Sequence, residues 1–441
     1  MAKLILSADT YSQCAFSVDA NSGLAILPAG RCLGALPTLY DKDGHFVKVV
    51  NNWFFDLKSV ESLKNLNSYS RALLSYWSFL EDNQLSWDKF PPVKRLKPTY
   101  LFKEHLLTKI NKSNIARSTA NHYMNHVVHF YKWAINEGFL IIKNEKEAPF
   151  ILQFVDIARN DKFAYMQRTF VVETVDLKIK VYKDADSQNI SSMNPLSRDY
   201  IRLLAFSLLT EAEEFRLQCL LAVQCGLRIS EACSITVDAL NFASPTTELK
   251  TRYQILIGPS NGVKTKYGKE RHIEISNHLL NELRKYLISE RRLKRINKLT
   301  KRISQIISGE ITVSASTRNE LEQCEKFQPL FVSEQGNPAD SKVTSVRWSE
   351  FRRKIRKNEP EFKHKFHDLR CTYATYRLSD LLEAGLPIQE ALDCLRGWMG
   401  HKNDMTTCKY LRFLKRQDVV KQKFALLDSI MCEAMEETSE W

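Results

Sequence analysis

Five side chains in the second half of the sequence have the chemistry to hold a phosphate and attack it: Arg228, His367, Arg370, His401 and Tyr410. A guanidinium group stays charged at any working pH and can bind two phosphate oxygens through parallel hydrogen bonds. Two arginines from distant parts of the chain can therefore clamp one phosphodiester and stabilise a pentavalent transition state. We interpret Arg228 and Arg370 as this clamp and the tyrosine as the candidate nucleophile.

The first arginine lies in a motif that predicts a junction between two helices, Gly226-Leu227-Arg228-Ile229-Ser230-Glu231. The glycine is expected to end one helix, and the residues after the arginine begin the next. Backbone N–H groups at a helix start attract phosphate. Glu231 lies three residues after Arg228, on the same helix face, and could hold the guanidinium in place. A surface Arg–Glu pair is the alternative interpretation.

The second motif, His367-Asp368-Leu369-Arg370, places its histidine and arginine on one helix face. A histidine beside a clamping arginine can accept or donate a proton near neutral pH. Taken alone, this motif is equally typical of a capping or core histidine. Further on, His401 follows Gly400 and a mostly apolar stretch. We expect His401 to begin a short helix that has Tyr410 near its end.

The order of these motifs resembles that of the tyrosine recombinases, the family of the phage integrases. The matching features are GLRISE, a lysine-bearing β-hairpin, HDLR, a Gly-His pair, and a tyrosine nine residues after that histidine. The resemblance covers most of residues 195–420. It assigns the family's site residues to Arg228, Glu231, Lys266, His367, Arg370, His401 and Tyr410.

The resemblance implies covalent catalysis on duplex DNA. Tyr410 would attack the scissile phosphate, forming a 3′-phosphotyrosyl bond and releasing a 5′-hydroxyl. His367 would take the tyrosine proton, and His401 would hydrogen-bond the phosphate. Lys266 would protonate the leaving oxygen, while Glu231 supports the clamp. The site would need no metal and no other cofactor, because the arginines supply the positive charge.

Three features depart from the family's common pattern: Met399 stands where leucine is usual, Glu274 where proline is frequent, and the stretch between the hairpin and HDLR is long. The general acid is also ambiguous. Lys266 is favoured by counting back from Lys269-Glu270-Arg271, but Lys264 is two residues away and would face the same side of a regular strand.

Hydrophobic periodicity predicts the surrounding elements. Helices are expected at 60–83, 100–110 and 118–136, with Ser118 as an N-cap, and strands at 165–182 and 251–275. The predicted fold class is mainly α with a small β-sheet: a tyrosine-recombinase-like catalytic domain preceded by a helical core-DNA-binding domain. The expected domains are an N-terminal appendage of strands or irregular structure (1–54), the helical domain (55–145), a β-rich segment and linker (146–194), the catalytic domain (195–420), and a C-terminal tail that packs in trans (421–441).

The charge balance favours a polyanionic partner. The 441 residues include 64 Lys+Arg against 51 Asp+Glu, a formal net charge of +13. Charge alone suits nucleic acid or an anionic membrane surface, and a basic protein without such a partner is the alternative. The resemblance implies double-stranded DNA as the partner, bound by a homo-oligomer, a tetramer on paired sites. No membrane-spanning run or signal peptide is evident, so the sequence predicts a cytoplasmic, nucleoid-associated protein with reduced cysteines.

Two further groups of residues remain open at this stage. The basic run 290–303 is either a solvated helix face or a DNA-backbone contact, and the residues proposed for the contact, with Lys264, are Arg291, Arg292, Arg295 and Lys298. His122, His126 and His129 share one helix face, but no carboxylate or cysteine completes a metal site, so a phosphate-facing or neutral role is favoured. The rival functions are a type IB-like topoisomerase and a non-catalytic DNA-binding protein of the same fold.

Overall fold

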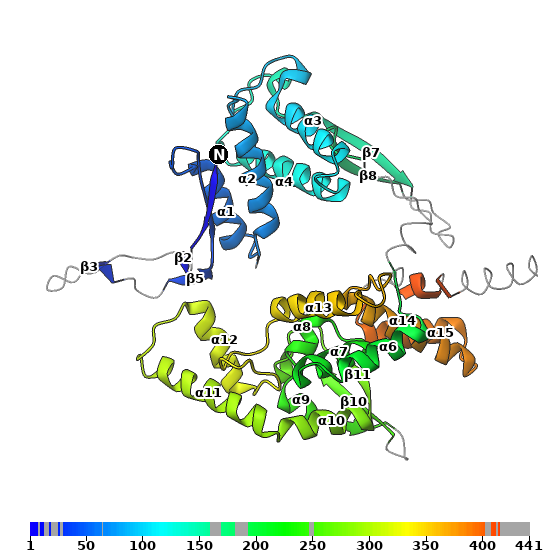
Figure 1. The fold of residues 1–441 in the computed structure, drawn as a ribbon. Helices are drawn as coiled ribbons and strands as arrows, with labels where there is room; N and C mark the ends of the chain where they lie inside the picture. Colours follow the sequence, from blue (N-terminus) through cyan, green and yellow to red (C-terminus); the bar gives the residue numbers. More distant parts are fainter. Residues whose placement is uncertain are drawn as a thin grey trace, which may run out of the picture. The chain divides into compact units, whose positions relative to one another are not determined.

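The chain forms two compact units in a computed structural model (Figure 1). Unit 1 comprises Met1–Tyr182 with Ser314–Ser316, and unit 2 comprises Lys183–Val313 with Thr317–Trp441. The predicted fold class, mainly α with small β-sheets, is confirmed. The structure describes residues 1–7, 9–12, 17–18, 25–26, 30–63, 65–158, 169–180, 193–246, 251–401, 407–411 and 413–414.

Unit 1 begins with short antiparallel strand pairs. The strands are β1 (Lys3–Leu6), β2 (Thr10–Ser12), β3 (Ser17–Val18), β4 (Ala25–Ile26), β5 (Arg31–Gly34) and β6 (Pro37–Tyr40). β1 pairs with β6, β2 with β5 and β3 with β4, so the pairs are nested along the chain. The Asn51 side chain joins β6 to the first helix, because it exchanges hydrogen bonds of 2.7 and 2.9 Å with the backbone of Leu39.

The helices of unit 1 enclose an aromatic core. They are α1 (Lys48–Ser59), α2 (Asn67–Asp82), α3 (Pro98–Asn111) and α4 (Arg117–Asn136), with 3-10 turns η1 (Lys94–Leu96) and η2 (Glu145–Glu147). Trp53, Phe102 and Phe130 are fully buried in this core. The buried hydroxyls of Tyr76 and Tyr131 are 2.7 Å apart, and Tyr131 donates to a backbone carbonyl, so both polar groups are satisfied.

Two predictions for this region differ from the structure. The N-cap residue of α4 is Ala116, and no side chain caps this end of the helix. Ser118 therefore lies inside the helix instead of capping it. α1 begins at Lys48, so the expected domain boundary between residues 54 and 55 falls inside a helix. The physical reason is that residues 47–57 contribute to the same apolar core as the later helices.

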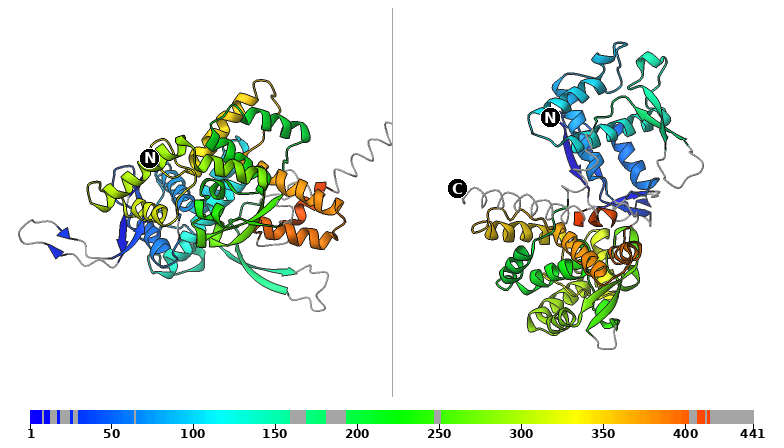
Figure 2. Two further views of the ribbon diagram at one scale, coloured as in Figure 1. Left: turned by 90° about the horizontal axis from the view of Figure 1, so that it is seen from below. Right: turned by 90° about the vertical axis from the view of Figure 1, so that its right-hand side faces the viewer.

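A long two-stranded hairpin follows the helices of unit 1. β7 (Leu152–Ala158) pairs with β8 (Thr169–Val175) in antiparallel register, and the pair projects as a ribbon (Figure 2). β8 lies within the stretch predicted to form strands. After it, Leu177 and Ile179 return to the helical core and are buried there. In the predicted β-rich segment and linker (146–194), residues 159–168 and 181–192 lie outside the described residues.

Unit 2 is mostly helical around one small sheet. Its elements are α6 (Arg198–Leu208), α7 (Glu213–Cys225), α8 (Ile229–Cys233), α9 (Val237–Asn241), β9 (Ser244–Pro245), β10 (Arg252–Ile257), η3 (Pro259–Asn261), η4 (Lys266–Gly268), β11 (Arg271–Ser276), α10 (Asn277–Leu287), α11 (Glu290–Ile307), α12 (Ala315–Lys326), α13 (Ser341–Ile355), α14 (Phe366–Glu383) and α15 (Ile388–Met399). α7 packs against α14 at the centre of the unit.

The sheet of unit 2 has the antiparallel order β11-β10-β9. Ile255 lies opposite Ile273 in the register, and both are fully buried on one face of the sheet. The alternation continues to Ile275 and back to Arg271, which is buried on the same face. This apolar face packs against α7 and α10, so β11 is held close to the helices that carry the first arginine motif.

Candidate active site

The first arginine motif forms a tight junction between α7 and α8. α7 ends at Cys225, and Gly226 reverses the chain in a left-handed conformation with φ of 68°. A Cβ atom on Gly226 would collide with the Tyr373 ring, so glycine is required for space as well as for conformation. Arg228 then becomes the N-cap residue of α8, at a helix start as the sequence predicts.

Glu231 is fully buried, and both of its carboxylate oxygens are shared between two arginines. Oε1 accepts from Nη1 of Arg228 at 2.8 Å and from Nη1 of Arg271 at 3.0 Å. Oε2 accepts from the backbone N–H of Arg228 at 2.9 Å and from Nη2 of Arg271 at 2.6 Å. Burial alone would raise the pKa of Glu231, but the hydrogen bonds and charges of Arg271, Arg228 and Arg370 lower it to about 2.

The second arginine enters the same cluster from α14. Asp368 caps this helix by accepting the backbone N–H of Lys365 at 2.7 Å. Arg370, only 2% exposed, donates to the carbonyl oxygens of Gly226 and Met399, and its Nη1 lies 3.9 Å from Glu231. Burial and the Arg228 charge lower the pKa of Arg370 to about 9, so the guanidinium remains charged at neutral pH.

His401 does not begin a helix, contrary to the prediction. It follows the end of α15, where Gly400 adopts a left-handed conformation with φ of 59°. The N–H groups of Gly400 and His401 bond back to the carbonyls of Gly397 and Arg396, at 3.1 and 3.3 Å. The last carbonyls of α15 are thereby satisfied, which is why the helix stops here and His401 is presented just beyond it.

Tyr410 lies in the helical segment 407–411 and is buried. It packs with Cys371 of α14 and with Leu395 and Met399 of α15. Its ring is parallel to that of His401, with an interplanar angle of 4° and 6.2 Å between the ring centroids. Burial, together with the Cys371 thiol, raises the pKa of Tyr410 above its usual range, and the neighbouring arginine charges oppose this rise.

The two histidines of the cluster are both held neutral at neutral pH. Burial, followed by the charges of Arg370 and Arg228, lowers the pKa of His401 to about 3. Its Nδ1 atom lies 3.0 Å from the Thr407 hydroxyl. His367 has an exposed side chain, yet partial desolvation and the Arg370 charge lower its pKa below the ordinary value. Neutral imidazoles can accept a proton or donate a neutral hydrogen bond.

The two candidate lysines lie in the loop between β10 and β11. Neither is on a regular strand, so the expectation that they share a face does not apply. The loop instead folds into turns, because the Val263 N–H bonds back to the Gly258 carbonyl at 3.0 Å. Lys264 forms an ion pair with Glu320 of α12. Lys266 is exposed in η4, with its ammonium 5.1 Å from the Tyr267 ring centroid.

The basic run on α11 is mostly occupied within the fold. Arg292 is only 2% exposed and donates to the carbonyl oxygens of Leu330, Pro329 and Leu287, at 2.8, 3.0 and 3.2 Å. This burial contradicts its predicted contact with a DNA phosphate. The physical reason is the amphipathic pattern of α11, which turns Arg292 toward the core together with Ile296 and Leu299.

The other charges proposed for DNA contact on α11 also have partners. Arg291 and Arg295 both bond to Oε1 of the buried Glu214, at 2.7 and 2.5 Å. Arg295 and Lys298 donate to the carbonyl oxygens of Val332 and Glu334. Successive turns of α11 therefore bind successive residues of the segment 328–337. These side chains connect α11 to that segment.

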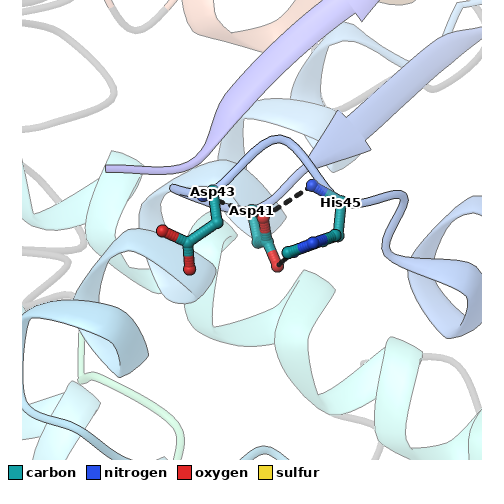
Figure 3. Close-up of side chains that lie close together, drawn as sticks. All are labelled: Asp41, Asp43 and His45. Carbon is teal, nitrogen blue, oxygen red and sulfur yellow. Dashed lines mark hydrogen bonds and ion pairs between the residues drawn. The ribbon is translucent and has the colours of Figure 1, made fainter.

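Two other groups have metal-ligand chemistry but carry ordinary contacts. Asp41, Asp43 and His45 gather in the exposed loop between β6 and α1, where Asp41 accepts the N–H groups of the other two residues (Figure 3). On α4, His126 is 2.7 Å from the Ser68 hydroxyl and His129 is 3.8 Å from Glu61. No third ligand joins these α4 contacts among the described residues.

Arg271 is the member of the cluster that the sequence interpretation missed. Besides its two bonds to Glu231, its Nε donates to the Trp398 carbonyl oxygen at 2.8 Å. The signal was its position in β11, where Arg271 alternates with Ile273 and Ile275 and so faces the core. A charged side chain on an apolar strand face requires a buried partner of opposite charge, and Glu231 is the partner of Arg271.

The family assignment rests on sequence. A model described as the phage integrase family matches residues 196–416, just over half of the chain. The chain belongs to this family. The match covers the arginine cluster of this integrase family member together with His401 and Tyr410. The family is one of DNA recombinases that use a tyrosine.

Several solved structures match this integrase family member at low sequence identity. The Tn1549 transposon integrase (residues 82–397) in complex with circular intermediate DNA is 15% identical, with a TM-score of 0.47, 82% of this chain covered and 94% of that one. A lambda integrase (75–356) dimer bound to a COC′ core site is 13% identical, with a TM-score of 0.41 and the same coverage. XerA recombinase is 14% identical, with a TM-score of 0.31, covering 84% and 96%. These values are too low for residue-level comparison.

A comparison with curated proteins found no match. Among the described residues, no helix is both long enough and apolar enough to cross a membrane.

Proposed function

We propose that this protein is a site-specific DNA recombinase that cleaves and rejoins DNA through a 3′-phosphotyrosyl intermediate. One observation carries the proposal: residues from α8, α14, the end of α15 and the segment 407–411 meet in one electrostatically coupled cluster. The pKa of His401 responds to Arg370 and Arg228, and the pKa of Tyr410 responds to the same two charges. These are the residue types that covalent phosphoryl transfer requires.

The charge of the cluster suits the transition state. Three guanidinium groups, those of Arg228, Arg271 and Arg370, surround the single carboxylate of Glu231. With both histidines neutral, these contacting groups carry two net positive charges. A phosphodiester has one negative charge, and attack by a deprotonated tyrosine adds a second. The cluster therefore stabilises the attacked state more than the resting diester.

In the proposed reaction, the Tyr410 oxygen forms a bond to phosphorus and its proton passes to neutral His367. The bond from phosphorus to the 5′-oxygen breaks, and Lys266 supplies a proton to that oxygen. Lys266 is preferred over Lys264 because the charge of Lys264 is already engaged by Glu320. A 5′-hydroxyl from a second strand then attacks the phosphotyrosine and restores the enzyme. Strand exchange of this kind requires paired sites, and we propose a homo-tetramer on double-stranded DNA.

The clamp is asymmetric in the DNA-free protein. The Arg228 side chain is partly exposed, whereas Arg370 is almost completely covered. We propose that Arg228 makes the first contact with the phosphate, and that Arg370 acts initially through its charge. The raised pKa of Tyr410 keeps the nucleophile protonated until DNA and a base are in place.

The test is covalent trapping on a nicked duplex that carries a candidate recombination site, sought as inverted repeats in the DNA that flanks the gene. The wild-type protein should form an adduct that survives a denaturing gel, also in EDTA. Tyr410→Phe should bind this DNA but form no adduct. Tyr373→Phe is the matched control, because its buried hydroxyl has no hydrogen-bond partner in the described structure. An adduct of Tyr410→Phe at the wild-type level would place the nucleophile elsewhere.

Two further outcomes separate the rival functions. No adduct with the wild-type protein, despite specific binding, would indicate a non-catalytic DNA-binding protein. Relaxation of supercoiled DNA without Holliday junctions on paired sites would indicate a topoisomerase. Loss of cleavage in EDTA, restored by Mg²⁺, would contradict the metal-free reaction.

A further inference from the structure

Arg271 makes a three-way connection at the centre of unit 2. It is held in β11 at the end of the sheet, and its guanidinium spans the gap between α8 and the last turn of α15. Three of its five N–H donors have acceptors: both oxygens of Glu231 and the Trp398 carbonyl oxygen. We propose that Arg271 is a positioning residue for DNA cleavage, fixing Arg228 through Glu231 and fixing His401 through the end of α15. This inference rests on the proposed recombinase function.

The first link in this connection is geometric. Arg228 is held by Glu231, through one side-chain bond of 2.8 Å and one backbone bond of 2.9 Å. Glu231 has no exposed surface, so its orientation depends on its buried partners. Arg271 contacts both carboxylate oxygens in a bidentate pair, which fixes the plane of the carboxylate. Without Arg271, Glu231 keeps only its two bonds to Arg228 and the nearby Arg370 charge, so the Arg228 guanidinium is held less firmly.

The second link runs to the histidine. Arg271 and Arg370 donate to the adjacent carbonyl oxygens of Trp398 and Met399, at the negative end of α15. The next residue, Gly400, lies directly against Arg271, since a Cβ atom there would be 2.9 Å from Cδ of Arg271. His401 follows immediately. The Gly400-His401 turn therefore packs directly against the Arg271 side chain.

Removing Arg271 would also change the charge state of Glu231. The charged groups that face this carboxylate are Arg228 on its own helix, Arg271 on β11 and Arg370 on α14, with His401 neutral nearby. Arg271 contributes the largest part of the lowering of the Glu231 pKa. Its loss should raise that pKa, because burial then acts with less opposition. A protonated Glu231 would no longer hold Arg228.

The experiment measures single-turnover cleavage of the nicked duplex by full-length Arg271→Met and Arg271→Lys from pH 5 to pH 8. Arg271→Met should bind the duplex within about threefold of wild type, because the Arg271 side chain is buried and bonds to acceptors within the protein. Its cleavage should fall roughly 10²-fold, the cost of a misplaced catalytic group. It should also fall further toward low pH, where Glu231 becomes protonated. Arg271→Lys keeps the charge and should show an intermediate rate without the added acid loss.

The matched control is Arg252→Met. Arg252 lies in the neighbouring strand β10 and pairs with Glu274 at 3.2 Å, without contacting Glu231. It should cleave like wild type. A purely structural role for Arg271 would instead lower cleavage by one factor at all pH values and lower the melting temperature in proportion; this outcome overturns the inference, as does wild-type cleavage by Arg271→Met.

If Arg271→Met fails to fold, Arg271→Lys serves as the test. A wild-type rate and pH profile of this variant would overturn the inference, and a reduced cleavage rate with retained DNA binding would support it. Failure of the proposed function is distinguishable, because it would leave the wild-type protein itself without an adduct.

Discussion

At the scale of single residues, burial determines which proton-transfer states the site can use. Both histidines have lowered pKa values and are neutral at neutral pH, whereas Tyr410 has a raised pKa and keeps its proton. Tyr410 can therefore attack only when its proton is transferred to a base, and a neutral histidine can accept that proton. His367 is the exposed member, so it is the one that DNA and solvent can reach.

The Thr407 hydroxyl should fix the tautomer of His401. If the His401 Nε2–H donates to the phosphate, Nδ1 must accept a hydrogen bond, and the Thr407 hydroxyl is 3.0 Å away. Thr407→Val keeps the shape and removes this donor, so we expect cleavage to fall about tenfold, the equivalent of one hydrogen bond, with DNA binding unchanged. Thr407→Ser should restore the rate measured with the nicked duplex. Equal rates for the Val variant and wild type would exclude this role.

The acid limb of cleavage should report His367. As a base it must be neutral, and its pKa lies below the ordinary 6.5, so lowering the pH should reduce cleavage only below that value. The measurement is the cleavage rate at protein concentrations far below saturation, which reports the free enzyme. His367→Gln should be slow throughout and lack this limb. An acid limb centred at or above pH 6.5 in the wild-type protein would assign it to another group.

At the scale of elements, α11 shows that a basic run need not be a nucleic-acid surface. Arg292, Arg295 and Lys298 follow one another at intervals of three residues and donate to backbone carbonyl oxygens in the segment 328–337. Gly336 completes the fit, because a Cβ atom there would lie 2.9 Å from the Lys298 side chain. The sequence interpretation left both alternatives open, and it could not name the acceptors of these side chains, because they lie more than thirty residues further along the chain.

Neutralising Arg292 should therefore affect stability more than DNA binding. Arg292→Met leaves several buried carbonyl oxygens without a donor, which should cost about 2 kcal/mol of unfolding free energy. Lys301→Met is the control: the side chain is exposed and makes no ion pair in the described part of α11, so stability should change by less than about 0.5 kcal/mol. Denaturant unfolding and the salt dependence of DNA binding measure the two effects. A reduced salt slope for Arg292→Met at unchanged stability would return Arg292 to the DNA surface.

At the scale of the whole molecule, the family match lies in unit 2, which carries every residue of the proposed reaction. Unit 1 has its own aromatic core, nested strand pairs and hairpin. The proposed chemistry is therefore confined to one of the two units.

The C-terminal tail should support assembly between protomers. Its apolar residues around Phe424–Met435 lie close together in sequence and fall outside the described residues. Truncation after Arg416 should leave binding to one DNA site intact and reduce assembly on paired sites, measured by the size of the DNA complexes. Full-length protein on a single site is the control. Equal assembly by the truncated protein would show that the tail is not needed between protomers.

The sequence by itself named the arginine–histidine–tyrosine set as the candidate site and predicted the fold class. Both depend on local information: residue types, short spacings and helical periodicity. The junction at Gly226 and Arg228 was predictable for the same reason, since a glycine that ends one helix before the next is a feature of neighbouring residues.

Only the tertiary structure decided how these residues are supported. The partner of Arg271 is forty residues away in Glu231, and its second acceptor is the Trp398 carbonyl, so no local pattern could name either one. The same holds for Lys264, whose charge is engaged by Glu320 on a distant helix. Side-chain chemistry can be read along a chain, but which charges neutralise one another depends on long-range packing, and that packing exists only in the folded protein.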